Sequence, residues 1–460
     1  MSAWEALMWR AEGDARTSST GILVEILEGV PDWPRLVAAH RHLAARFPRL
    51  CERVVEPPIP LVQPTWSGVA DFALDEHLRM ATLEPGSDEA DLLRFCEDLM
   101  ADPLDLSRPP WEAVIVTGLK SGRAAYLFRF HHSLTDGLGL IQLMTLAHAA
   151  EPTTSPLRSY RTPVHPVVTP WGVLASRVGQ QLGRGPQNVL GQVRAGLRLA
   201  GRIAEHPAQT AREATAFASS LSRMLAGPDA AGSPLLATQS TGVRFLTLDV
   251  DLADLRAASQ AVGSSVNDAF LAAIVGGMRI YHEHYGTVPD TIPLAMPVSL
   301  RAQDDPLGGN KFAGVRMAAP LAEPDPRKRM AIIREFVLTV RDEPALRFLD
   351  DLSPVLTKLP AHAIIELSAS LTSASDLQVS NIRGIGHPVF LAGQQVLRTY
   401  PLGPRPGVAA MVAMITYDGV CCVGLNVDPA IFNDTDLLMS SLEQGFTEVL
   451  ALRPDESSRS

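Results

Sequence analysis

The sequence predicts an α/β fold in which two α/β halves are joined by a helical connection, and three observations lead to this prediction. Helix and strand patterns alternate from the start of the chain to about residue 150. They alternate again from about residue 242 to residue 452, whereas the segment between them is helical in composition. A chain of 460 residues is also long enough for two or three domains.

The first half, residues 1–150, is expected to contain both strands and helices. Apolar residues three and four positions apart line one face of a helix, and alternating apolar and polar residues are typical of a strand. These patterns predict strands at Leu23–Leu27, Ala113–Thr117 and Ala124–His132, a turn at Ser121-Gly122, and helices at Trp33–Phe47, Asp91–Ala101 and Gly137–Ala150.

The connection, residues 151–241, begins with a loop, because five prolines between residues 152 and 170 prevent regular structure. The following segment, Trp171–Met224, is helical in composition and contains seven arginines, no lysine and two glutamates. Its net charge of +5 contrasts with −10 for the whole chain. This arginine-rich segment therefore requires an explanation of its own.

The second half, residues 242–460, returns to alternating strands and helices. Asp251 is placed to cap a helix, because an aspartate side chain accepts hydrogen bonds from the first backbone amides. The predicted strands are Val243–Val250, Ile292–Val298, Gly314–Ala318, Phe390–Leu391, Val408–Tyr417 and Val420–Val427, and the predicted helices are Asp251–Val262, Asn267–Tyr285 and Thr435–Leu452.

Composition excludes several classes of protein. Hydrophobic residues make up 46% of the chain and charged residues 20%, which is typical of a globular protein with a large core. A net charge of −10 argues against a general nucleic-acid binder, which needs a basic surface. Four cysteines are too few for a disulfide framework, and Cys421 and Cys422 are expected in the core. The N-terminus has no secretory pattern and no apolar run reaches the roughly 18–20 residues of a membrane span, so a cytoplasmic enzyme is expected.

The strongest local signal is the run His131-His132-Ser133-Leu134-Thr135-Asp136-Gly137, where a strand ends and a helix begins. Successive side chains of a strand point to opposite faces, so His131 and His132 diverge. His132 shares its face with the aromatic residues of the strand, and His131 lies on the other face. Asp136 orients the loop or pairs with a distant cation, and Gly137 is expected to let the backbone turn tightly into the helix.

Two adjacent histidines at a strand end can also be metal ligands or hydrogen-bonded core residues. A metal site is disfavoured, because the two side chains diverge and no nearby cluster completes a ligand shell. The chain contains no G-x-S-x-G nucleophile elbow, no phosphate-binding loop and no dinucleotide-binding glycine motif. Without an activated serine or cysteine, the simplest catalytic use of the histidine is as a general base.

Beyond this chemistry, the run matches the H-H-x-x-x-D-G signature of CoA-dependent acyltransferases and of peptide-synthetase condensation domains. Further blocks, in the same order along nearly the whole chain, resemble the bacterial wax ester synthase/diacylglycerol acyltransferase family. Pro110 departs from that pattern, since a leucine is usual there. The blocks are Ala3–Ala11, Pro103–Glu112, Val266-Asn267-Asp268, Pro297–Arg301 with Gly309-Asn310, Ser380-Asn381-Ile382 with Gly384, and Tyr417-Asp418-Gly419.

The resemblance implies a fold of two similar halves, each a mixed β-sheet flanked by helices. It further implies an active site in a solvent tunnel between the halves, and a strand from the C-terminal part that crosses to the first half. The implied reaction transfers an acyl group from a CoA thioester to a hydroxyl. Acyl-CoA is then a substrate, and no cofactor is expected.

The resemblance also implies roles for single residues. His132 is the general base, which then protonates the departing CoA thiolate, and no acyl-enzyme forms. Asn267 either stabilises the oxyanion or only caps its helix, and Asp268 supports the helix start. Related enzymes pair the aspartate of the signature with an arginine, for which Arg301 is the candidate here. His131 supports the site from behind, Gly137 is a backbone requirement, and Ser380 and Asn381 belong to a further motif of the family.

The acceptor remains open at this stage. Diacylglycerol and a long-chain alcohol lead to triacylglycerol and wax ester, whereas another hydroxyl would indicate specialised metabolism. A lipid-droplet protein without activity is a third hypothesis, which intact His132, Asp136 and Asn267 disfavour.

For the arginine-rich segment, three interpretations stay open: a solvated helix face, a contact with a lipid surface, or a contact with the phosphates of CoA. If the segment contacts a lipid surface, peripheral association with a membrane or a lipid droplet is expected. A homodimer is a further partner that the sequence leaves open.

Overall fold

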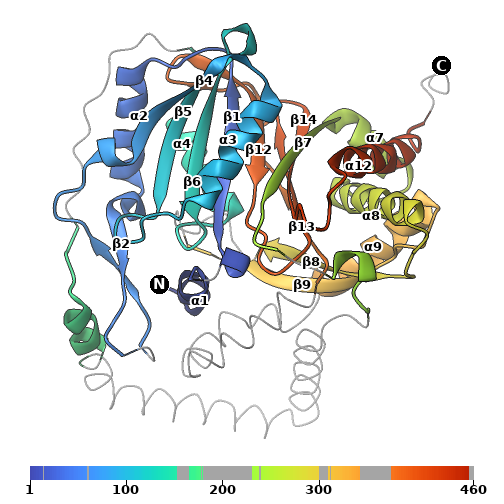
Figure 1. Ribbon diagram of the computed structural model, residues 1–460, viewed down its shortest axis with the longest axis horizontal. Coiled ribbons are helices and arrows are strands. Elements are labelled where there is room, and N and C mark those ends of the chain that lie inside the picture. Colours follow the sequence, from blue (N-terminus) through green and yellow to red (C-terminus); the bar gives the residue numbers. More distant parts are fainter. Residues whose placement is uncertain are drawn as a thin grey trace, which may run out of the picture.

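The computed structural model describes residues 1–13, 15–59, 62–152, 165–177, 179, 230–237, 240–299, 309–310, 312–341 and 375–454. Two of the predictions lie outside these residues. One is Arg301 as the partner of Asp136, and the other is the arginine-rich segment beyond residue 179. Within the described parts, two mixed β-sheets lie side by side, each accompanied by helices (Figure 1). The predicted fold class is therefore confirmed.

The first sheet, on the left in Figure 1, carries the histidine pair on one of its central strands. Neighbouring strands are antiparallel except β4 and β5, which run parallel. Ser121 and Gly122 form the predicted turn between β5 and β6, with φ of 61° and 70°. In the described chain the spatial order is β11 (Phe390–Leu391), β12 (Gln394–Leu402), β1 (Thr20–Leu27), β6 (Ala124–His131), β5 (Trp111–Leu119) and β4 (Leu78–Ser87).

The second sheet is also mixed, because β10 runs parallel to both of its neighbours and the other pairs are antiparallel. Cys421 and Cys422 lie buried on one of its central strands, as predicted, and burial raises the pKa of both thiols to about 12 and about 11. The spatial order in the described chain is β7 (Arg244–Asp251), β14 (Val420–Val427), β13 (Ala410–Tyr417), β10 (Leu377–Ile382), β8 (Ile292–Ser299) and β9 (Phe312–Ala319).

Strand β12 links the two halves. It lies late in the sequence but pairs antiparallel with β1 of the first sheet over Ile22–Leu27. Side chains from β11, β12, β13 and β14 also complete the hydrophobic core of the first half. This is the crossing strand that the family resemblance implies, and it makes the first half depend on the C-terminal part of the chain.

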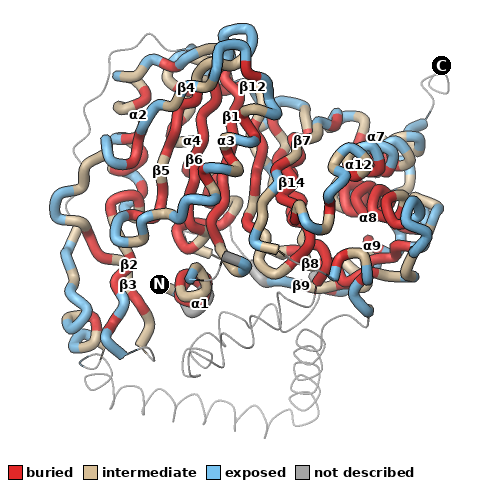
Figure 2. Tube along the Cα trace, in the orientation of Figure 1, coloured by how far each residue is buried: buried red, intermediate tan, exposed pale blue. Residues whose placement is uncertain are grey.

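Helices cover both sheets, and Figure 2 shows their buried sides turned to the strands. Asp251 caps α7 as predicted, by accepting a hydrogen bond from the amide of Asp254. Long helix α8 is the centre of the second core and is buried along most of its length. Residues 170–177 are also helical. The other described helices are α1 (Ala3–Ala11), α2 (Trp33–Arg46), α3 (Glu89–Ala101), α4 (Gly137–Ala147), α7 (Leu252–Ala261), α8 (Val266–His284), α9 (Pro326–Arg341) and α12 (Thr435–Leu450).

Short elements complete the described chain. A small hairpin, β2 (Glu52–Val55) with β3 (Thr65–Gly68), stands apart from the main sheets (Figure 1). The 3₁₀ turns are η1 (Ala15–Thr17), η2 (Pro48–Cys51), η3 (Leu74–Glu76), η4 (Lys120–Gly122) and η5 (Pro234–Leu236). Among the described helices none is alone long and apolar enough to cross a membrane, while α7 and α8 meet that criterion only as a pair bent by 96°.

Candidate active site

The loop between β6 and α4 carries the histidine pair, and we call residues 131–137 the histidine loop. Strand β6 ends at His131 and α4 begins at Gly137. The side chain of Asp136 caps α4, because its Oδ1 accepts a hydrogen bond from the amide of Gly139 at 2.8 Å. The amide of His131 donates to the carbonyl of Pro110 at 3.0 Å, so the Pro103–Glu112 block lies directly beside this loop.

His131 is completely buried on the side of the strand that faces α1. Its Nδ1 accepts a hydrogen bond from the amide of Ser133 at 3.0 Å, so the ring proton lies on Nε2. That Nε2 is 3.3 Å from Oε2 of Glu12, and the ring edge packs against Trp9. Burial raises the pKa of Glu12, but the interaction with His131 and the hydrogen bonds from Ser19 and Thr20 together outweigh it, and the net pKa is lowered.

His132 lies on the opposite side, as strand alternation predicts. Its ring packs against Phe130, with 5.4 Å between ring centroids, and the residue remains partly exposed. The pKa of His132 is lowered to about 4, mainly by burial and also by the neighbouring His131, while Asp136 and Glu12 act in the opposite direction. The imidazole therefore stays neutral at pH values well below about 6.5, the ordinary pKa of histidine.

Gly137 fits its place for a reason that differs from the prediction. We expected it to permit a tight turn, but Gly137 does not have a positive φ. Instead, a Cβ atom at this position would lie 2.5 Å from Cδ1 of Ile382 on β10. The glycine therefore allows the start of α4 to approach the second sheet closely.

Asn267 does not cap its helix, so that alternative is wrong. Ser265 caps α8, and it forms a reciprocal capping box with Asp268. Asp268 thus supports the helix start as predicted, and its carboxylate also lies 3.3 Å from Arg334. Asn267 stands one residue into the helix, which leaves its side chain available for other contacts.

Two of the family blocks meet at Asn267. Its Oδ1 accepts a hydrogen bond from Nδ2 of Asn381 at 3.4 Å, and Asn381 lies on β10. The neighbouring Ser380 is buried in the sheet. The amide oxygen of Asn267 is thus occupied by Asn381, and the hydrogen-bond donors of its side chain lie on the NH₂ group.

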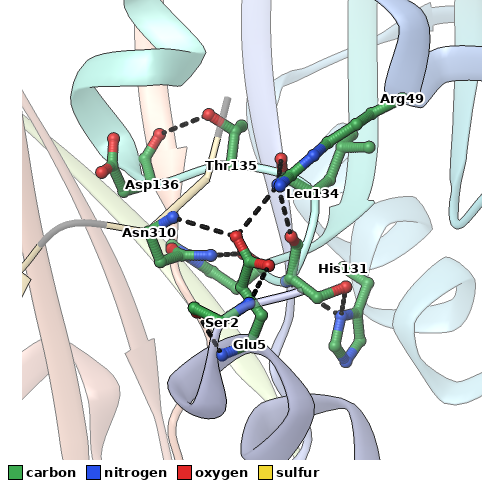
Figure 3. Close-up of polar contacts among 10 residues, drawn as sticks. Ser2, Glu5, Arg49, His131, Leu134, Thr135, Asp136 and Asn310 are labelled. Carbon is green, nitrogen blue, oxygen red and sulfur yellow. Dashed lines mark hydrogen bonds and ion pairs between the residues drawn. The ribbon is translucent and has the colours of Figure 1, made fainter. Parts of the chain in front are cut away.

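Two residues that the sequence analysis missed, Glu5 and Arg49, hold the histidine loop from outside, together with Asn310 (Figure 3). Nη1 of Arg49 donates to the carbonyls of Ser133 and Leu134, and Nδ2 of Asn310 donates to the carbonyl of His132. Glu5 and Asn310 stand in two of the family blocks, so the sequence contained a signal for both residues. Arg49 stands in no motif, and only its position in space reveals it.

No group of three or more residues suitable as metal ligands occurs in the described part of the chain. The fold and the loop together define a class: a two-halved α/β protein with an H-H-x-x-x-D-G loop between a strand of the first sheet and a helix that contacts the second sheet. This class contains CoA-dependent acyltransferases and condensation domains. Within this class, comparisons with known proteins identify the family.

The chain belongs to the wax ester synthase/diacylglycerol acyltransferase family. The model of the family's catalytic domain matches residues 1–270, and that of its C-terminal domain matches residues 308–449. A Mycobacterium tuberculosis protein named as a diacylglycerol O-acyltransferase is 36% identical over 446 residues, 97% of this chain and 90% of that protein. A second protein of that organism with the same kind of name is 27% identical over 78% of each chain. The chain is thus an acyltransferase.

Solved structures agree in fold. The wax ester synthase/diacylglycerol acyltransferase of Marinobacter aquaeolei matches with a TM-score of 0.63 at 18% identity, covering 97% of both chains. The first condensation domain of the CDA synthetase matches with a TM-score of 0.61 at 17% identity, covering 99% of this chain and 96% of that one.

Proposed function

We propose that this acyltransferase moves a fatty acyl group from acyl-CoA to the hydroxyl of diacylglycerol or of a long-chain alcohol, with His132 as the general base. The observation that carries the proposal is a neutral, partly exposed imidazole at the end of a buried strand, in a protein of this family. A starter condensation domain of the same fold was solved with C8-CoA, which supports acyl-CoA as the donor.

The proposed reaction needs one proton acceptor and one oxyanion donor. The acceptor hydroxyl attacks the thioester carbonyl while His132 takes its proton, which contributes roughly 10²–10⁴-fold to the rate of such reactions. The tetrahedral intermediate then collapses, the C–S bond breaks, and the imidazolium of His132 returns the proton to the thiolate of CoA. The products are an ester and free CoA, with no acyl-enzyme on the path.

Asn267 is the proposed oxyanion donor. Its amide oxygen is occupied by Asn381, its donors lie on the NH₂ group, and it lies in the first turn of α8, where backbone amides and the helix dipole favour negative charge. Asn381 would then act by fixing the orientation of this amide.

The decisive experiment measures thiol release from palmitoyl-CoA, with dioleoylglycerol or hexadecanol as acceptor. The wild-type protein should release CoA with at least one of them, and His132→Ala should lose nearly all turnover without unfolding. His131→Ala should melt at a lower temperature, because the buried ring contacts with Glu12 and Trp9 are lost, yet keep substantial turnover while folded. Equal loss in both variants at native-like stability would contradict the assignment of the base.

Other acceptors are the alternative. If neither lipid acceptor yields product while a polyketide, sugar or terpenoid hydroxyl does, the enzyme belongs to specialised metabolism. A protein that binds lipid droplets but releases no CoA with any acceptor would be a catalytically silent coat protein.

We further propose that the enzyme works in the cytoplasm at the surface of a membrane or lipid droplet, through its arginine-rich segment. The charge of +5 over Trp171–Met224 supports adsorption to anionic lipid, worth up to about 1 kcal/mol per basic residue and screened by salt. Anionic vesicles should co-sediment the protein better than neutral ones, and replacing Arg194, Arg198 and Arg202 with glutamine should weaken this.

A soluble short-chain alcohol separates the competing interpretations of the same triple variant. Unchanged turnover with this acceptor is expected, whereas a raised KM for acyl-CoA would indicate a contact with CoA phosphates. Unchanged vesicle binding would leave only a solvated helix face.

A further inference from the structure

Three successive backbone carbonyls of the histidine loop are held by two side chains that the mechanism does not use. Nδ2 of Asn310 donates to the carbonyl of His132 at 2.6 Å. Nη1 of Arg49 donates to the carbonyls of Ser133 and Leu134 at 3.3 and 3.2 Å. The loop is thus fixed from the carbonyl of the proposed base onward.

One carboxylate contacts both residues, through the side chain of Arg49 and the backbone of Asn310. Oε1 of Glu5 accepts from Nη1 of Arg49 at 3.0 Å and from the backbone amide of Asn310 at 3.3 Å. Its Oε2 accepts from the amide of Ser2 at 2.9 Å, within the capping box of α1. Glu5 is only 2% exposed, and its ion pair with Arg49 offsets part of the cost of burying the carboxylate.

The members of this group come from three separate parts of the chain. Glu5 belongs to α1, Arg49 belongs to η2, and Asn310 follows β8 in the second half. The guanidinium of Arg49 also lies over the ring of Trp66, at 5.0 Å from the ring centroid, which restricts its orientation.

Gly309 brings the second half against the loop. Its carbonyl accepts a hydrogen bond from the amide of Asp136 at 3.3 Å, and it forms an isolated β-bridge with Thr135. Gly309 has φ of +80°, a conformation that favours glycine, and a Cβ there would stand 3.4 Å from Oε1 of Glu5.

We infer that Glu5, Arg49 and Asn310 are positioning residues of the active site, which make the geometry of His132 depend on contact between the two halves of the chain. None of them would touch substrate, and the inference rests on the proposed role of His132. Displacement of a catalytic group by about 1 Å can cost about 10²-fold in rate, so the loss of such contacts should appear in kcat.

The first test replaces Asn310 by aspartate, which keeps the shape but exchanges the donor for a carboxylate that repels the carbonyl of His132. We expect Asn310→Asp and Asn310→Ala to lower kcat by roughly 10- to 100-fold, with KM for acyl-CoA changed less than about 3-fold. Glu5→Gln should act similarly, because glutamine can preserve the capping box with Ser2 but not the charge opposite Arg49.

Asn426 offers a matched control. It is buried, and its Nδ2 donates to the carbonyl of Gly403 at 2.9 Å, without any contact to the histidine loop in the described chain. Asn426→Ala should lower the melting temperature while leaving kcat near that of the wild type. If kcat falls equally in the Asn426 and Asn310 variants at matched stability, the effect is general destabilisation and the inference is overturned.

Hydrogen exchange of the peptide that spans residues 131–137 gives a readout that needs no turnover. Exchange should be faster in Asn310→Asp and Glu5→Gln than in the wild type, and unaltered in Asn426→Ala. If this peptide exchanges at the wild-type rate in both Asn310→Asp and Glu5→Gln, the inference is overturned, whatever the substrate of the enzyme is. Faster exchange in a protein whose wild type releases no CoA would instead support the positioning contacts and remove the proposed function.

Discussion

At the scale of single residues, the pKa of His132 decides how the proposed base responds to pH. Burial lowers this pKa to about 4. At pH 5.5 such a histidine is more than about nine-tenths neutral, whereas an ordinary histidine with a pKa of about 6.5 is about one-tenth neutral. The base loses activity only when it is protonated, so kcat/KM should stay nearly flat from pH 8 down to about pH 5.

This prediction can be checked with rapid thiol-release assays over that range, each preceded by a test that the protein remains folded. Substituting Glu12 by glutamine removes a charge that raises the pKa of His132, so the acidic limb should not move upward. An acidic limb with its midpoint near 6.5 in the wild type would show that the group limiting catalysis is not a His132 with a lowered pKa.

A second prediction at this scale concerns Asp136, whose side chain caps α4. Asp136→Ala should destabilise the protein by about 1 kcal/mol and reduce turnover, because the cap is lost and the histidine loop is released from the helix. Asp136→Asn separates the two roles considered for this residue, since asparagine caps a helix as well as aspartate but carries no charge.

Melting curves and kcat of the two variants decide between these roles. Near-native stability of Asp136→Asn is expected if capping dominates. If asparagine is as damaging as alanine, an ion pair of Asp136 with a cation such as Arg301 becomes the better explanation.

At the scale of elements, the sequence predicts the helices and strands that show a clear periodic pattern of apolar residues within the element itself. The helix at Trp33–Arg46 and the strand Val420–Val427 show the expected periods, so their predicted bounds agree with the structure within one residue. Helix Gly137–Ala147 ends three residues earlier than predicted, because His148 is already extended. Edge strand β4 was not predicted, since most of its residues are exposed and Pro85-Gly86 suggests a turn.

Strand β12 shows a different reason for failure. Its segment, Gln394–Leu402, is polar at its start and contains Pro401, so no clear strand pattern marks it. That it pairs with β1, more than 360 residues earlier in the chain, cannot be read from any local pattern. The family resemblance implied such a crossing, but did not say which segment makes it.

The same division applies to the candidate site. His132 and its separation from His131 follow from strand alternation, which is a local property of the backbone. The capping of α8 by Ser265 rather than Asn267 was missed, although serine three residues before an acid is a capping-box pattern. Arg49 could not be predicted, because its role arises only where α1, η2 and the second half meet.

At the scale of the whole molecule, β12 joins the two halves, because it contacts both sheets. This strand belongs to the first sheet through β1, and it also packs against β13 and β14 of the second. Tyr400 on β12 donates a hydrogen bond to Asp249 on β7 at 3.0 Å, which joins the sheets again. Asn310 reaches the histidine loop from the second half. The geometry of the site therefore depends on the relative position of the two sheets.

The two sheets approach each other closely at Gly424 on β14. A Cβ atom there would stand 2.2 Å from the carbonyl oxygen of Pro401 and 2.9 Å from its carbonyl carbon, and neither backbone atom can move without shifting β12. Gly424→Ala should therefore cost about 1–3 kcal/mol or more through overpacking. Differential scanning calorimetry should show a lower melting temperature.

Gly314 on β9 is the matched control, since it is also a strand glycine of the second sheet but has no heavy atom within 4 Å of a built Cβ. Gly314→Ala should leave the melting temperature unchanged or slightly raised, because alanine restricts the unfolded chain more than glycine. A Gly424→Ala protein that melts like the Gly314→Ala protein would mean that β12 and β14 are not in close backbone contact. Asn310 and Gly309 would then be the residues that connect the second half to the histidine loop.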